Sequence, residues 1–231
     1  MNAKKWLAGF QAQDQSLTLL LGAVLLMVFF IHPLAEGGPL AKILLGTSAS
    51  VVLVSGILVV SGQRLLTLLG GMLGGLTLLA DLAQLVSPGP ILSALRNVLF
   101  FLFLGLLNSV ILHRVIREGP VNRQRIEGSI LVYLILGLMW SQAYQLLETL
   151  RPGSFAIPAP IPGAEGLGLK LTYFSFVTLT TVGYGDITPL IPFARSLALL
   201  EALTGQLFPV ILIARLVAME VESRRGNLVA R

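Results

Sequence analysis

Six apolar stretches of about the length of a bilayer crossing run through this chain. The hydrocarbon core of a membrane is about 30 Å thick, and crossing it takes roughly 20 helical residues. The shorter stretches reach that length when a flanking charge such as Asp81 or Arg96 lies near an interface. The pattern predicts an all-α integral membrane protein with six transmembrane helices, in the segments 15–35, 43–63, 65–80, 97–112, 128–147 and about 194–219.

The remaining composition argues against soluble functions. Of the 231 residues, 55% are hydrophobic and 12% are charged, which is far more apolar than an ordinary soluble domain. Cysteine is absent and the two histidines are His32 and His113, so the sequence offers neither a disulfide framework nor a thiolate metal site. It also lacks a phosphate-binding glycine loop before a helix. We expect no enzyme, no cofactor and no nucleic-acid partner.

Lysine and arginine are distributed unequally between the two sides of the predicted spans. Numbered from a cytoplasmic N-terminus, the outer side holds Lys42, Arg151 and Lys170. Positive charge concentrates in the cytoplasmic loops of membrane proteins, so the sequence predicts a multi-pass protein of the cell membrane with both termini in the cytoplasm. A cleaved signal peptide is the alternative for the first span, but no convincing cleavage site follows it. The inner side holds Lys4, Lys5, Arg64, Arg114, Arg117, Arg123, Arg125, Arg224, Arg225 and Arg231.

A further uncharged stretch, 171–185, is too short to cross the membrane and suits a re-entrant loop buried inside protein. It overlaps the sequence Thr-Leu-Thr-Thr-Val-Gly-Tyr-Gly-Asp-Ile-Thr-Pro at residues 178–189. Within this motif, Gly183 and Gly185 can adopt positive φ without a Cβ penalty, which lets successive carbonyl groups face one axis. Larger side chains at these two positions would close a passage along that axis.

The core of this motif resembles the selectivity filter of potassium channels, in which four loops replace the hydration shell of K⁺ with backbone carbonyls. The resemblance implies that Val182 and Tyr184 point backwards and brace the loop against its supporting helix. It also implies that Asp186 closes the motif at the outer end and hydrogen-bonds behind the filter. The residues that it assigns to binding the permeant K⁺ are Thr181, Val182, Gly183, Tyr184 and Gly185.

From Gly128 to Arg225 the chain resembles the pore module of the tetrameric potassium channel superfamily, and its last span is similar to that of bacterial members. Tyr173 and Phe174 stand where the family braces its filter from the pore helix. Tyr173 can hydrogen-bond Asp186, whereas Phe174 has no polar group for this role. The Gly-Tyr-Gly sequence occurs once, so four copies must supply the filter and we expect a homotetramer. The implied elements are an outer helix at 129–150, a pore helix at about 169–180, a filter at 181–186 and an inner helix at 194–219.

The expected inner helix contains candidate gating residues. Gly205 lies at the family's hinge spacing after the filter, and Pro209 frees a backbone carbonyl at the same bend, so both are candidate hinge residues. In the family register, one face of this helix lines the cavity below the filter. That face consists of Gln206, Pro209, Ile213 and Val217.

Glu201 is an ionisable residue inside the sixth span, where it is costly without a partner. A structural hydrogen bond to the pore helix, at Thr178 or Thr180, is one interpretation. A role in gating is the other.

The first four spans, within residues 16–113, are placed like a voltage-sensor domain but lack its arginine repeat. One charge crossing 100 mV contributes about 2.3 kcal/mol, so a voltage sensor needs several such charges. Arg96 stands alone in the fourth span until Arg114 and Arg117 at its cytoplasmic end. We therefore expect weak or no voltage dependence, with Arg96 paired to Asp81. A sensing role for Arg96 is the alternative.

Together these features predict a channel that conducts K⁺ passively through a fourfold filter. A potassium transporter subunit and a nonconducting, channel-like membrane scaffold are the alternatives. Transporters of that kind carry several filter-like loops per chain, whereas this chain has one. The remaining segments are expected to be an interfacial N-terminus at 1–15, a cytoplasmic linker at 114–128 and a short cytoplasmic tail at 220–231, without a soluble regulatory domain.

Overall fold

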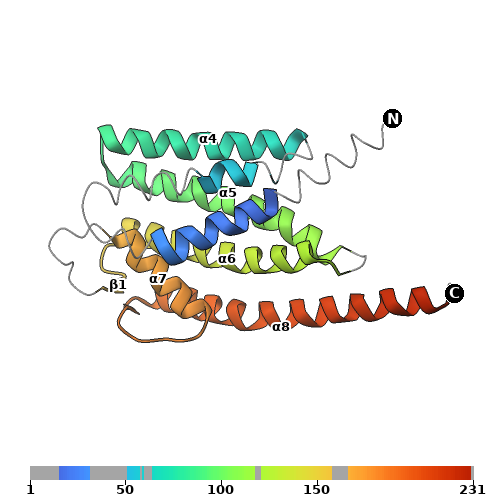
Figure 1. Cartoon of the computed structure of the whole chain (residues 1–231). Coiled ribbons are helices and arrows are strands. Elements are labelled where there is room, and N and C mark those ends of the chain that lie inside the picture. The colour runs from blue at the N-terminus through green and yellow to red at the C-terminus, as the bar shows by residue number, and fades with distance from the viewer. Residues whose placement is uncertain are drawn as a thin grey trace.

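The computed structural model describes residues 16–31, 51–57, 59, 64–117, 121–157 and 166–229, which are mostly helical (Figure 1). A short helix, α7 (Leu167–Leu179), precedes the last helix, and β1 (Phe155–Ala156) pairs with β2 (Thr188–Pro189). Four of the described helices are long and apolar enough to cross a membrane. They are α4 (Arg64–Val86), α5 (Pro90–Ile116), α6 (Arg123–Leu150) and α8 (Pro192–Val229).

The first two predicted spans are only partly described. An apolar helix starts at Ser16 and continues into a π-helix, η1 (Met27–Ile31). Residues 51–57 and 59 are helical and belong to the second predicted span. The described part of the chain therefore forms a multi-pass helical protein, while the count of six spans stays a prediction. The expected interfacial segment 1–15 lies outside the described residues.

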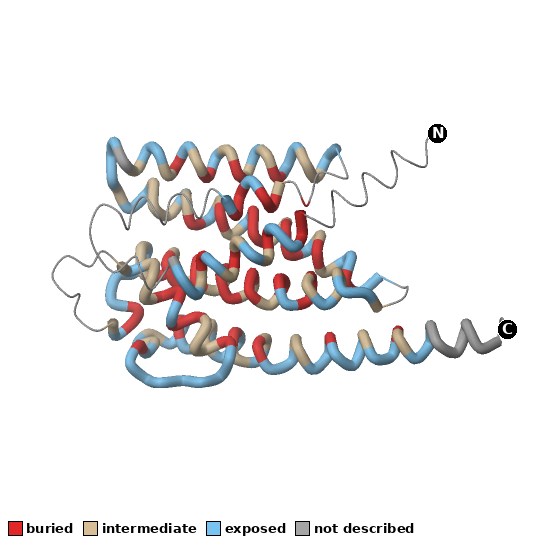
Figure 2. Tube along the Cα trace, viewed as in Figure 1, coloured by how far each residue is buried: buried red, intermediate tan, exposed pale blue. Residues whose placement is uncertain are grey.

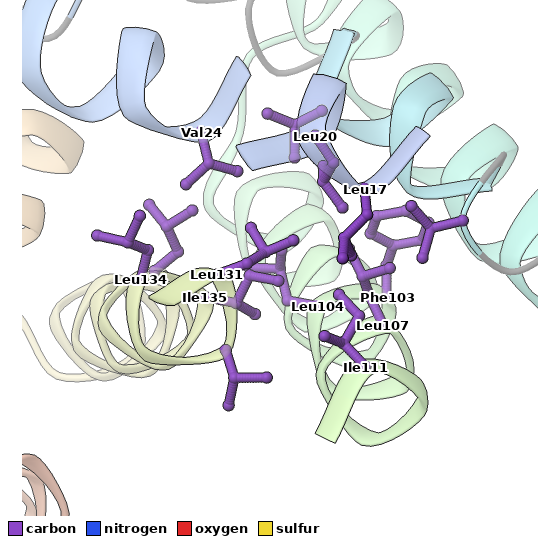
Figure 3. Packing of buried hydrophobic residues seen from close by; sticks show 14 of the residues in the cluster. Leu17, Leu20, Val24, Phe103, Leu104, Leu107, Ile111, Leu131, Leu134 and Ile135 are labelled. Carbon is purple, nitrogen blue, oxygen red and sulfur yellow. The ribbon is translucent and has the colours of Figure 1, made fainter. Parts of the chain in front are cut away.

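The main hydrophobic core forms where α5, α6 and the N-terminal helix meet (Figure 3). Most of the residues that α5 contributes lie three or four positions from the next, so they fall on one face of the helix. α4 packs against α5 and forms the outer edge of the bundle (Figure 1). The core contains Leu17, Leu20 and Val24 from the N-terminal helix, Phe103, Leu104, Leu107 and Ile111 from α5, and Leu131, Leu134 and Ile135 from α6.

Local sequence explains where two of the helices begin. Pro90 occupies the first turn of α5, where its missing N–H removes no helical hydrogen bond. The side chain of Asn122 caps α6 by accepting a hydrogen bond from the Arg125 amide at 3.1 Å. Because α5 continues to Ile116 and α6 begins at Arg123, much of the expected linker 114–128 is helical.

The pore-like half differs slightly from its predicted bounds. α7 begins and ends close to the expected 169–180, and the outer helix extends the expected 129–150 at its N-terminal end. The inner helix continues past 219 to Val229, so most of the expected tail 220–231 is helical. Polar residues after 219 end the apolar pattern on which that boundary rested, but they do not end a helix.

Leu104→Ala should lower the free energy of unfolding by about 2–5 kcal/mol, because it removes buried carbon atoms and leaves a cavity. Leu104 is 0% exposed, whereas Leu102 on the same helix is 48% exposed, so Leu102→Ala is the matched control. Thermal and chemical unfolding of the two variants in detergent would measure the difference. Equal destabilisation by both substitutions would contradict the core described here.

Candidate functional site

The chain leaves α7 through a turn in which successive amides point back at the helix. The Thr180 amide donates to the carbonyl of Phe176 at 3.0 Å, and the Thr181 amide donates to that of Thr178 at 2.9 Å. The Val182 amide then donates to the carbonyl of Val177 at 2.9 Å. The last turn of α7 therefore fixes where residues 181–185, the predicted filter, begin.

Within the described ranges, no backbone or side-chain group donates a hydrogen bond to the carbonyl oxygens of residues 181–185. Residues 181–185 are exposed in the single chain, so their carbonyl oxygens are open to water or to a ligand. Carbonyl oxygens are the kind of ligand that hard cations prefer.

The strand alternates in backbone conformation. Thr181, Gly183 and Gly185 have φ of 59°, 62° and 79°, so every second residue lies in the left-handed region. The two glycines were expected there because they lack a Cβ. Thr181 was not expected, since a β-branched residue with positive φ is strained. Thr181 stands two residues before Gly183, as Gly183 stands two before Gly185, and this spacing could have predicted its positive φ.

The side chains of Val182 and Tyr184 are largely exposed in the single chain, at 52% and 71%. Tyr184 lies close enough to Tyr173 of α7 to contribute to its raised pKa. The expectation that Val182 and Tyr184 brace the loop against α7 stays a prediction.

Asp186 and Tyr173 lie together, as expected from the sequence. The pKa of Tyr173 is raised by partial desolvation and then by its hydrogen bond to the neighbouring Asp186 carboxylate. Phe174 points elsewhere: it is buried in an aromatic cluster with Tyr144 and Phe155, with ring centroids 5.1 Å and 5.5 Å away. Its support for the filter is indirect, because the same cluster buries Ile187, the residue after Asp186.

The β-pairing holds the outer loop beside this cluster. Phe155 lies opposite Pro189 and Ala156 lies opposite Thr188. The carboxylate of Glu148 accepts hydrogen bonds from the amides of Gly153 at 2.7 Å and Phe155 at 3.2 Å, which closes the turn after α6. The chain on both sides of the filter is thus tied to the end of α6.

Glu201 is the charged residue buried most deeply at the helix junction. It is 0% exposed, Tyr144 of α6 donates a hydrogen bond to its Oε2, and Ser175 Oγ of α7 lies 2.5 Å from its Oε1. The expected bond to the pore helix is confirmed, but its partner is Ser175. Thr180 was the wrong residue because its hydroxyl donates instead to the carbonyl of Phe176.

Glycines let α6 and α8 approach α7 closely. A Cβ added to Gly205 of α8 would lie 1.8 Å from the carbonyl oxygen of Leu179, at the end of α7. A Cβ added to Gly137 of α6 would lie 2.8 Å from the ring of Phe176. The structure gives Gly205 a packing role, and α8 runs through Gly205 and Pro209 as one helix. The hinge role of these two residues stays a prediction.

α8 is buried along one stripe and exposed along the rest (Figure 2). Its buried positions include Glu201, Leu212 and Met219, which pack against the same chain. The expected cavity residues fall outside this stripe: Gln206, Ile213 and Val217 are exposed and Pro209 is partly exposed. The single chain therefore leaves this face open, which agrees with the expected lining without testing it.

Arg96 forms the predicted pair with Asp81, at 3.6 Å between Nη1 and Oδ1. The polar contacts of Arg96 extend beyond Asp81. Arg96 Nη2 donates to Gln145 Oε1 of α6 at 3.5 Å, and Gln145 Nε2 donates to Ser141 Oγ at 3.0 Å. Ser141 Oγ lies 2.7 Å from Thr172 Oγ1 on α7, so a chain of polar contacts links α4 to the pore helix. Sequence reasoning missed these last three residues, because their types alone carry no signal.

Comparison with known proteins places the site within an ion channel domain. Residues 165–222 match the family model described as "Ion channel". The inward rectifier potassium channel Kirbac3.1 of Paramagnetospirillum magnetotacticum is 34% identical over 80 residues, which cover 33% of this chain and 23% of that protein. Protein LctB of Bacillus caldotenax is 31% identical over 130 residues, which cover 51% of this chain and 94% of LctB. No solved structure matches the chain.

These matches and the apolar helices identify a multi-pass membrane protein with an ion channel domain, and not an enzyme. They support the potassium channel superfamily and an oligomeric assembly in the membrane.

Gly205→Ala should destabilise the protein, because the new methyl group collides with a backbone carbonyl that cannot rotate away. We expect a cost of about 1–3 kcal/mol, which lowers the melting temperature by several degrees. Gly75→Ala on α4 is the control, since a Cβ there meets no heavy atom within 4 Å. Differential scanning fluorimetry in detergent measures both; an unchanged melting temperature for Gly205→Ala would contradict the close approach of α8 to α7.

Proposed function

We propose that this chain, which belongs to the same family as protein LctB, forms a potassium-selective channel. Its ion channel domain and its similarity to an inward rectifier potassium channel support the proposal. One observation carries this proposal. Residues 181–185 combine alternating positive φ with carbonyl oxygens that accept no hydrogen bond from the described residues. Backbone carbonyls arranged around an axis replace the hydration shell of K⁺ in potassium-selective filters. The proposed ion-binding residues are therefore Thr181, Val182, Gly183, Tyr184 and Gly185.

A homotetramer follows from the same proposal. One chain supplies one strand of carbonyls, and a dehydrated cation needs oxygens on every side. The exposed side chains of Val182 and Tyr184, together with the open face of α8, are the surfaces available for neighbouring copies. In this assembly Gln206, Ile213 and Val217 line the cavity below the filter, and Gly205 and Pro209 are the candidate positions for bending.

The electrostatics of α7 favour a cation at the inner end of the filter. The C-terminal end of a helix carries a partial negative charge from its free carbonyls. α7 ends at Leu179, directly before the filter strand, so in a tetramer four such ends face the cavity. Asp186 adds a carboxylate at the other end, where it raises the local concentration of cations.

The proposed topology has six spans and both termini in the cytoplasm of the cell, which places the filter's outer end outside. The charge distribution of the sequence supports this orientation. The polar contacts from Asp81 and Arg96 to Thr172 tie α4 and α5 to the pore helix. These two helices therefore serve as a support for the pore helix.

Purified protein in liposomes should take up ⁸⁶Rb⁺ rapidly, exclude Na⁺, and be blocked by Ba²⁺. Gly183→Ala should reduce the K⁺ over Na⁺ preference by about tenfold or more, equivalent to ~1.4 kcal/mol, because its φ of 62° is strained for a side chain. Gly71→Ala, with open space around its Cβ, is the matched control. Slow, saturable uptake would indicate a carrier, absence of uptake a nonconducting scaffold, and either result would contradict the proposal.

The conductance should depend weakly on voltage. Arg96 is paired with Asp81, so moving the two together across the field transfers no net charge. Arg96→Gln should leave the shape of the conductance–voltage relation unchanged in planar-bilayer recordings. A steep rise over tens of millivolts that flattens in this variant would show that Arg96 senses voltage.

A further inference from the structure

Glu201 lies where three helices meet behind the filter. It belongs to α8, and its two carboxyl oxygens contact Tyr144 of α6 and Ser175 of α7. It is 0% exposed and lies within a helix long enough to span the membrane. An ionised carboxylate in such a place has to be compensated by a cation or by several hydrogen-bond donors.

Among the described residues, no cation forms an ion pair with Glu201. The titratable groups that face it are the phenols of Tyr144 and Tyr133 on α6. From α7 the contacting group is the neutral hydroxyl of Ser175.

The number of hydrogen atoms available to these contacts constrains the protonation state of Glu201. The hydroxyl of Tyr144 donates to Oε2. Ser175 Oγ lies 2.5 Å from Oε1 of Glu201 and 2.7 Å from the carbonyl oxygen of Gly137 on α6. A serine has one hydroxyl hydrogen, and a peptide carbonyl can only accept. If Ser175 donates to Gly137, its contact with Glu201 is a hydrogen bond only when Glu201 supplies the hydrogen.

We propose that Glu201 is held as a neutral, protonated carboxylic acid that joins α6, α7 and α8 and thereby positions the pore helix. Tyr144 donates to Oε2, the Oε1 hydroxyl of Glu201 donates to Ser175, and Ser175 donates to Gly137. In this series of hydrogen bonds, every donor has one acceptor. Its effect on conduction rests on the function proposed above, whereas the protonation itself does not.

When Glu201 loses its proton, this series of hydrogen bonds is broken. Ser175 then has to turn its hydrogen toward the carboxylate, and its bond to Gly137 is lost. Ser175 is on the turn of α7 before Val177, whose carbonyl holds the amide of Val182 in the filter. Tyr144 also packs on Phe174 and Phe155, beside the chain that follows the filter. Deprotonation should therefore loosen the filter from both sides.

Stability and flux should both fall as the pH rises from neutral to mildly alkaline. The folded state holds a proton that the unfolded state has already released, so stability decreases over that range. Glu201→Gln should abolish this pH dependence, because its amide donates to Ser175 and its carbonyl accepts from Tyr144 without any titration. Glu201→Leu fills the space without hydrogen bonds and should lower ⁸⁶Rb⁺ flux about tenfold or more, since it orphans buried hydroxyls.

Infrared spectroscopy of the wild-type protein in lipid tests the proton directly. At neutral pH we expect the carbonyl band of a protonated carboxylic acid, which Glu201→Gln removes and the exposed Glu222→Gln leaves in place. Absence of that band, or a melting temperature whose alkaline fall persists in Glu201→Gln, would overturn the proposal. If the band is present but no variant conducts K⁺, the proposed function fails and the protonated Glu201 stands.

Discussion

The hydrogen bonds between the last turn of α7 and the first amides of the filter strand determine the rest of this site. They turn the amides of Thr181 and Val182 toward the helix, while the carbonyls of residues 181–185 accept no hydrogen bond from the described residues. Alternating positive φ at Thr181, Gly183 and Gly185 accompanies that arrangement. The geometry of this short backbone segment therefore depends on where α7 ends.

The helices around α7 are arranged so that its end cannot shift. Gly205 brings α8 against the carbonyl of Leu179, and Gly137 brings α6 against Phe176. Between these two close approaches lies the group formed by Glu201, Tyr144 and Ser175. Small residues and buried polar bonds together make a rigid junction of three helices, and the polar contacts from Arg96 extend it toward α4. Buried networks of this kind specify one packing arrangement when every member has a partner.

Much of this arrangement could be predicted from the sequence, because each predicted feature has a local cause. Hydropathy placed the four long helices, the motif placed α7 and the filter strand, and the cost of a buried charge indicated that Glu201 bonds the pore helix. The hydroxyl of Ser175 and the contacts of Gln145 depend on how helices pack, so residue type alone did not reveal them. Positive φ at Thr181 could have been inferred from its place two residues before Gly183. The bracing role of Val182 and Tyr184 stays a prediction, since both side chains are exposed in the single chain.

We propose that the carbonyl oxygens of residues 181–185 coordinate dehydrated K⁺. Solid-state NMR of protein with ¹³C-labelled glycine carbonyls, reconstituted in lipid and titrated with K⁺ or Na⁺, measures this coordination. We expect the Gly183 and Gly185 carbonyl resonances to shift saturably with K⁺ and to respond differently or not at all to equal Na⁺. Identical responses to both ions, or no response to K⁺, would contradict it.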